Sequence, residues 1–142
     1  MRVEHSVYLI IKSEDIEPPE VTRLVGLAPD LAKAKHSRTI AGSVKVPRAH
    51  LWQIDSGLDA YEPIERHVEA LTLRVAPYAQ RIGAIVGART KCFLTIVRRY
   101  HTSPAPAPLG FGLDGGTVEL LATMRAEVDI DEYDYTEVPA EG

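Results

Sequence analysis

Cysteine is nearly absent from this sequence of 142 residues, in which Cys92 is the single example. One cysteine excludes an internal disulfide and any zinc site built from several cysteines. A chain without disulfides suits a reducing compartment, so we expect a cytoplasmic protein. Residues 1–12 also lack the long apolar stretch and the cleavage site of a signal peptide. No apolar run approaches the roughly 18 residues that a membrane-spanning helix needs, so we expect no membrane partner.

Concentrated positive charge is also missing. The chain has 16 lysines and arginines against 20 aspartates and glutamates, a net charge of −4. Because phosphate binding requires clustered lysine and arginine, we expect no nucleic-acid partner. The 45% hydrophobic content is sufficient for one buried core. We therefore predict a single domain over residues 1–135, followed by a flexible C-terminal tail at residues 136–142.

Recognisable catalytic and cofactor motifs are absent as well. The sequence contains no dinucleotide-binding glycine fingerprint, no P-loop and no zinc-protease helix motif. The histidines show no metal-ligand spacing. Residues 110–116 are rich in glycine but hold no basic residue, so we interpret them as a loop and helix cap, not a phosphate site. We expect no catalytic residue, no cofactor and no metal.

Hydrophobic periodicity is present and predicts the elements. Ile64, Val68, Leu71 and Val75 recur at steps of four, three and four residues, which is one face of an amphipathic helix. In chain order the patterns predict a strand at 3–11, a helix at 18–26, a poor edge strand near 36–41, a strand at 49–56, a helix at 63–76, a helical piece at 78–87, a strand at 91–102, a short helix at 116–125 and a strand at 126–135.

This order of elements predicts an α+β fold. Its first six elements match a ferredoxin-like βαββαβ sandwich, with an added C-terminal helix and strand. We expect a mainly antiparallel sheet with the helices of residues 18–26 and 63–76 on the same face. His67 is expected at the boundary or surface. The predicted core consists of Leu9, Leu24, Ile54, Val68, Leu71, Leu94 and Ile96.

Acidic residues are concentrated on the last strand. Asp129 and Asp131 share one strand face, roughly 7 Å apart, and Glu127 and Tyr133 lie on the same face. A divalent cation could use such a row of oxygens, but a solvated edge is the more common explanation. Two further alternatives are ion pairing with Lys91, Arg98 or Arg99 on a neighbouring strand, and contact with a basic partner. We therefore name Asp129, Asp131 and Tyr133 as the candidate interaction surface.

The same charges suggest where the last strand lies. Arg98, Arg99 and Lys91 belong to the preceding strand, and opposite charges on adjacent strands stabilise a sheet. We predict that residues 126–134 pair with residues 91–100. A short helix crossing between them would make the pair parallel.

Four segments together carry a family resemblance. They are LVGLAPD at residues 24–30, LWQIDS at 51–56, IERHVEAL at 64–71 and VDIDEY at 128–133. In this order they resemble the small bacterial family DUF4279, a domain of unknown function, over about residues 5–135. One departure is the stretch at residues 32–36, where the lysine-glycine-aspartate of such proteins is missing. Because the family has no established activity, the resemblance implies no catalytic residues.

These observations favour a non-enzymatic cytoplasmic domain that binds another protein or itself, through exposed strand edges. An immunity- or antitoxin-like inhibitor is one concrete form of such a domain. The alternative is a small-ligand-binding protein or hydrolase with a site built from dispersed histidine, aspartate and tyrosine residues. A pocket lined by two or more of these groups would favour the alternative, and a flat apolar or acidic patch would favour the binding protein.

Overall fold

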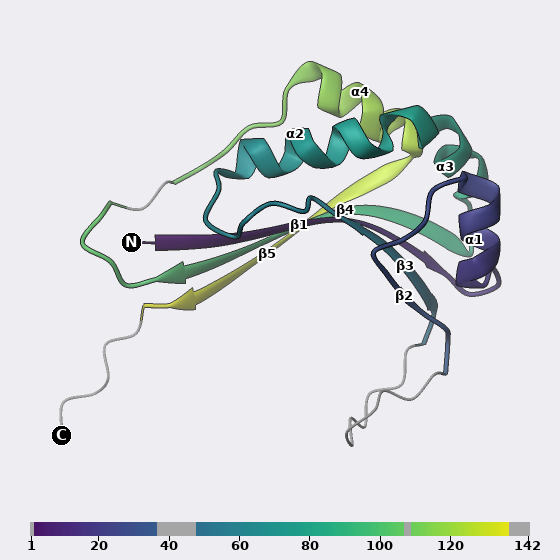
Figure 1. Ribbon diagram of the computed structural model, residues 1–142, viewed down its shortest axis with the longest axis horizontal. Helices are drawn as coiled ribbons and strands as arrows, with labels where there is room; N and C mark the ends of the chain where they lie inside the picture. Colours follow the sequence, from purple (N-terminus) through teal and green to yellow (C-terminus); the bar gives the residue numbers. More distant parts are fainter. Residues whose placement is uncertain (1, 37–47, 107–108, 137–142) are drawn as a thin grey trace.

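The computed structural model describes residues 2–36, 48–106 and 109–136 (Figure 1). A short 3-10 turn, Ala76–Tyr78, joins the second and third helices. The elements are β1 (Arg2–Ser13), α1 (Pro18–Val25), β2 (Leu31–Lys33), β3 (His50–Asp55), α2 (Ile64–Val75), α3 (Ala79–Ile85), β4 (Thr90–His101), α4 (Gly115–Met124) and β5 (Ala126–Tyr135).

The strands form one five-stranded sheet in the order β2-β3-β1-β4-β5. β1 pairs antiparallel with β3 and β4, and β2 pairs antiparallel with β3. β5 pairs parallel with β4, which confirms the predicted position of the last strand. The fold is therefore α+β with a mixed sheet. β5 is parallel to β4 because α4 carries the chain back to the end of the sheet at which β4 begins. The narrower ferredoxin-like description stays a prediction.

The poor edge strand expected near 36–41 falls almost wholly outside the described residues, which stop at residue 36 in this part of the chain. The described edge strand beside β3 is instead β2, at Leu31–Lys33. All of its residues are exposed, so it has no hydrophobic pattern by which it could be recognised. Of the predicted flexible tail, residues 137–142 also lie outside the described part.

The helices cover one face of the sheet, and no helix of the described residues covers the other. In Figure 1, α2, α3 and α4 lie on one side of the strands, with α1 beside α3. The side chains of β1 differ in burial between the two faces. Val7, Leu9 and Ile11 are buried, while Tyr8 and Ile10 on the opposite face are half-buried. The expected placement of the two main helices on one face is confirmed, since both contribute to the same core. We call the other side of the sheet the open face.

The core lies between the helices and the sheet, and it contains all but one of the predicted residues. Leu24 is half-buried, and Val21 and Val25, four residues apart on α1, occupy the core instead. Trp52 is fully buried, and its Nε1 donates a hydrogen bond to Thr22 Oγ1 at 3.1 Å. A buried indole N–H needs such a partner, which explains how a tryptophan fits at the centre of β3.

Two sequence interpretations of helix ends are confirmed. Gly26 ends α1 with φ of 85°, a left-handed conformation that glycine adopts without a steric penalty. Asp114 precedes α4, and its side chain accepts a hydrogen bond from the Thr117 N–H at 2.7 Å. The glycine-rich segment before α4 is therefore a loop and a helix cap. Across the described ranges, no helix is long and apolar enough to cross a membrane.

Candidate functional site

β5 forms one edge of the sheet and is the most exposed strand of substantial length. It is ten residues long and pairs with β4 along one side, while no other described strand pairs with its outer side. Backbone N–H and C=O groups on such an outer side are available to another chain. We call this outer side of Ala126–Tyr135 the β5 edge.

The two faces of β5 differ in chemistry. The register places Glu127, Asp129 and Asp131 beside Phe93, Thr95 and Val97, on the open face. We call these three carboxylates the acidic row. Val128 and Ile130 lie on the helix side of the sheet, yet remain 42% and 46% exposed. The β5 edge thus combines a negative face with an apolar face.

The predicted ion pairs do not neutralise the acidic row. Asp129 and Asp131 lie beside Thr95 and Val97, and neither takes part in an ion pair with a described residue. The ion pair between β4 and β5 joins Arg98 to Glu132 at 3.8 Å, on the helix side. On the open face, Arg99 instead donates a hydrogen bond to Ser6 Oγ.

An aromatic ladder continues the open face beyond the acidic row. Tyr133 and Tyr135 stack with ring centroids 6.4 Å apart, and Tyr135 stacks on His101 at 5.4 Å. Tyr133 and Tyr135 are both exposed. The three residues named from the sequence, Asp129, Asp131 and Tyr133, therefore lie along one continuous strand face that ends in tyrosines.

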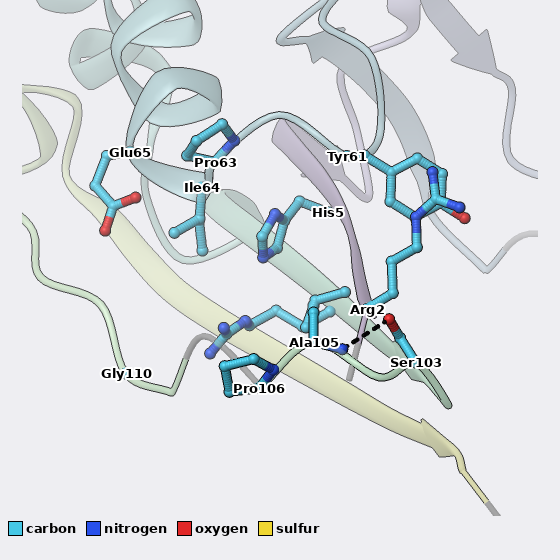
Figure 2. Close-up of a pocket in the computed structure, with 12 residues that line it drawn as sticks. Arg2, His5, Tyr61, Pro63, Ile64, Glu65, Ser103, Ala105, Pro106 and Gly110 are labelled. Atoms are coloured by element: carbon cyan, nitrogen blue, oxygen red, sulfur yellow. Dashed lines mark hydrogen bonds between the residues drawn. The ribbon is translucent and has the colours of Figure 1, made fainter.

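A pocket of about 530 Å³ lies at the end of the sheet where β1 begins (Figure 2). Its walls come from β1, the segment leading into α2, β4 and the loop after β4. We call it the His5 pocket, and its lining includes Arg2, His5, Tyr61, Glu65 and Arg98. The pocket escaped sequence analysis because these segments are far apart in the chain and share no motif.

His5 has one ring nitrogen satisfied and one free. Its side chain is 5% exposed, and Nδ1 lies 3.0 Å from the carbonyl oxygen of Glu62. Because a carbonyl only accepts, Nδ1 carries the proton in the neutral ring and Nε2 carries a lone pair. Nε2 is buried and has no hydrogen-bond partner among the described residues. Burial lowers the pKa of His5 below its ordinary value, and the Arg98 charge acts in the same direction.

His67 is buried next to His5, so its expected place at the boundary or surface was wrong. It follows Ile64 by three residues and precedes Leu71 by four, which places it on the apolar face of α2. Its Nδ1 lies 2.7 Å from Ser56 Oγ, and its ring meets that of His5 edge-on with centroids 6.0 Å apart. Burial lowers the pKa of His67 too, and the neighbouring His5 adds to the effect.

The two buried histidines predict a loss of stability in mild acid. Their folded-state pKa values lie below those of the unfolded chain, so the unfolded state takes up protons first as pH falls. The free energy of unfolding should be highest above about pH 6.5 and should decrease as pH falls below that value. Urea denaturation at a series of pH values measures this dependence. A free energy of unfolding that is constant or rises between about pH 7 and pH 5 would contradict it.

Arg98 is a buried cation that lines the His5 pocket. Its side chain is 3% exposed, and its guanidinium carbon lies 5.3 Å from the centroid of the Tyr100 ring and 5.2 Å from that of the Phe111 ring. Aromatic faces stabilise a guanidinium through the ring quadrupole. The half-exposed carboxylate of Glu132 lies 3.8 Å from the Arg98 guanidinium. Positive charge is thus held inside the molecule beside a cavity.

The environment of Cys92 is set by its position in the core. Cys92 is buried, as predicted, and burial raises the pKa of its thiol to about 12. Burial therefore disfavours the thiolate, which is the nucleophilic form of cysteine. Within the described part of the chain, no group of three or more histidine, cysteine, aspartate or glutamate side chains is placed to hold a metal ion.

Comparison with known proteins links the chain to one family. The family described as "Domain of unknown function (DUF4279)" matches residues 3–135, which is nearly the whole chain. No curated protein and no solved structure matches the chain significantly. The site geometry therefore has to support any functional proposal by itself.

Proposed function

The chain belongs to the DUF4279 family, whose members have no assigned function, and we propose that this member is a non-enzymatic, cytoplasmic protein that binds an extended segment of another protein along the β5 edge. The observation that carries the proposal is the long, exposed edge strand with opposite chemistry on its two faces. An immunity- or antitoxin-like inhibitor would be one form of such a protein.

The backbone of β5 supports this mode of binding. An added strand would form main-chain hydrogen bonds along the outer side of β5, and alternate side chains would supply specificity. Proteins usually keep edge strands short, twisted or covered, because a long free edge pairs with other chains. β5 has ten residues, and its exposed Val128 and Ile130 would be covered by a partner's apolar side chains.

The side chains of β5 define the chemistry of the partner. A segment added to the β5 edge would place every second residue beside the acidic row and the others beside Val128 and Ile130. The complementary segment alternates lysine or arginine with apolar residues. The carboxylates of Asp129 and Asp131 are available for it, because neither is paired with a described residue.

The acidic row also disfavours pairing of β5 with a second copy of the chain. Two β5 strands joined edge to edge about a two-fold axis would bring both acidic rows onto one face of the continuous sheet. Like charges on neighbouring strands are destabilising. Net charge adds to this effect, since each copy carries −4. A different, basic partner is therefore the occupant that fits.

A synthetic peptide of alternating lysine and valine tests the proposal. We expect it to bind the protein, with an affinity that falls as salt concentration rises. Replacing Asp129 and Asp131 together with asparagine should weaken binding by about 2- to 30-fold, because exposed ion pairs contribute about 0.2–1 kcal/mol each. The free energy of unfolding should change little. Fluorescence anisotropy of a labelled peptide and urea denaturation give the two readouts.

A matched variant separates the β5 edge from general charge. Glu69→Gln with Glu119→Gln changes the net charge by the same amount at exposed helix positions and should bind the peptide like the wild type. Two further peptides carry N-methyl groups on alternate residues, one on the odd-numbered and one on the even-numbered residues. One of the two should bind more weakly than the other, because its methylated nitrogens are those that would donate main-chain hydrogen bonds to β5. Equal binding by all proteins and peptides would contradict strand addition.

A further inference from the structure

The His5 pocket is separate from the β5 edge and has the composition of a ligand site. Its volume of about 530 Å³ is within the range typical of small-molecule pockets. Its wall combines apolar side chains with polar and charged ones. The apolar contributors are Val3, Pro63, Ile64, Ala105 and Pro106.

The charged groups of the pocket favour an anion. Arg98 contributes a buried guanidinium, and Arg2 contributes a second at the rim, 3.4 Å above the centre of the Tyr61 ring. Glu65 is the one carboxylate in the described lining, and it is exposed to solvent on the first turn of α2. A guanidinium binds a carboxylate through two parallel hydrogen bonds, and shielding from water strengthens the contact.

His5 indicates that a ligand of this pocket carries a hydrogen-bond donor. Figure 2 shows its ring among the residues that line the pocket. The ring projects from β1 with Nδ1 held by Glu62, so Nε2 offers a lone pair and has no partner among the described residues. Buried acceptors without a partner are uncommon because they cost free energy. Nε2 has almost no exposed surface, so a ligand O–H or N–H group satisfies this nitrogen after a small movement of the lining side chains.

We propose that the His5 pocket binds a small organic carboxylate that has an apolar body and a hydroxyl or N–H group. The carboxylate lies against Arg98 and Arg2, the apolar body contacts Ile64 and the prolines, and the donor group faces His5 Nε2. This site is independent of strand addition at the β5 edge. The proposal assigns binding only and involves no reaction of the ligand.

Benzoate, the three hydroxybenzoate isomers and benzamide are the probes. Benzoate should bind about tenfold more tightly than benzamide, its neutral counterpart of the same shape, because only the carboxylate forms charge-assisted hydrogen bonds. At least one hydroxybenzoate should bind more tightly than benzoate. Calorimetry measures the affinities, and NMR of the wild-type protein follows the Arg98 Nε–H and His5 ring signals, which should shift during the titration.

Variants locate the site. Arg2→Gln, at an exposed residue, should weaken benzoate binding and leave benzamide binding unchanged. Arg98→Gln should abolish the preference for benzoate. Because substitution of a buried residue also affects folding, the NMR shifts of the wild type serve as the independent readout. His5→Phe should remove the advantage of the hydroxybenzoate over benzoate. Equal binding of benzoate and benzamide, or binding that leaves the Arg98 and His5 signals unmoved, would overturn the proposal.

Discussion

Replacing Leu71 with alanine should lower the free energy of unfolding by about 2–5 kcal/mol. Leu71 is 1% exposed at the centre of α2, where it joins the core between the helices and the sheet. The substitution removes buried apolar atoms and leaves a cavity that neighbouring side chains only partly fill. Urea denaturation followed by circular dichroism measures the loss.

The same helix contains a matched control. Leu73 is two residues away and 70% exposed, so Leu73→Ala should change the free energy of unfolding by no more than about 0.5 kcal/mol. A loss of less than about 0.5 kcal/mol for Leu71→Ala would show that the apolar face of α2 does not pack as described. Equal losses for the two variants would lead to the same conclusion.

Replacing Gly83 with alanine should destabilise the protein by about 1–3 kcal/mol. Gly83 lies in α3, where α4 approaches closely, and an added Cβ would lie 2.2 Å from the backbone carbonyl oxygen of Thr123. That atom belongs to the backbone of α4, so the two helices would have to move apart. Without this contact, alanine would be favoured in a helix by about 0.5–1 kcal/mol.

Gly87 provides the comparison for that prediction. It lies shortly after α3, and a Cβ there would meet no atom within 4 Å. Gly87→Ala should therefore leave the free energy of unfolding nearly unchanged or raise it slightly, because alanine restricts the unfolded chain more than glycine does. A stabilising Gly83→Ala variant would contradict the close packing of α3 against α4.

The strongly patterned elements could be predicted from the sequence. The apolar spacing on α2 identified both the helix and its buried face, because a helix packed on one side needs that period. The parallel neighbour of β4 was predicted from charges and the intervening helix. The expectation of ion pairs between β4 and the acidic row was incomplete. The ion pair between β4 and β5 joins Arg98 to Glu132, and the acidic row takes no part in it.

The features that escaped prediction depend on tertiary structure. β2 is three exposed residues, held by pairing with β3 and not by a hydrophobic pattern. His67 could have been found, since it shares the face of Ile64 and Leu71, but polar residues on apolar faces are easily read as boundary positions. The His5 pocket could not have been predicted from the sequence, because its lining combines side chains from separate segments with a buried Arg98.

The pocket also has a bearing on the function predicted from the sequence. It is lined by His5 and Tyr61, two of the residue types expected of the alternative ligand-binding protein. The acidic row and the exposed edge are the features expected of the protein-binding domain. Because both are present at different places on the molecule, a ligand site and a partner site do not exclude each other here.

Amide hydrogen exchange along β5, measured by NMR with and without the lysine–valine peptide, tests strand addition most directly. In the free protein, amides of residues 126–135 that face the outer side should exchange fast, and those bonded to β4 slowly. Binding should slow the outer-side amides and leave the exchange of α2 and α3 unchanged. Bound peptide without new protection in β5, or with protection confined to another surface, would contradict the proposal that the β5 edge is the binding site.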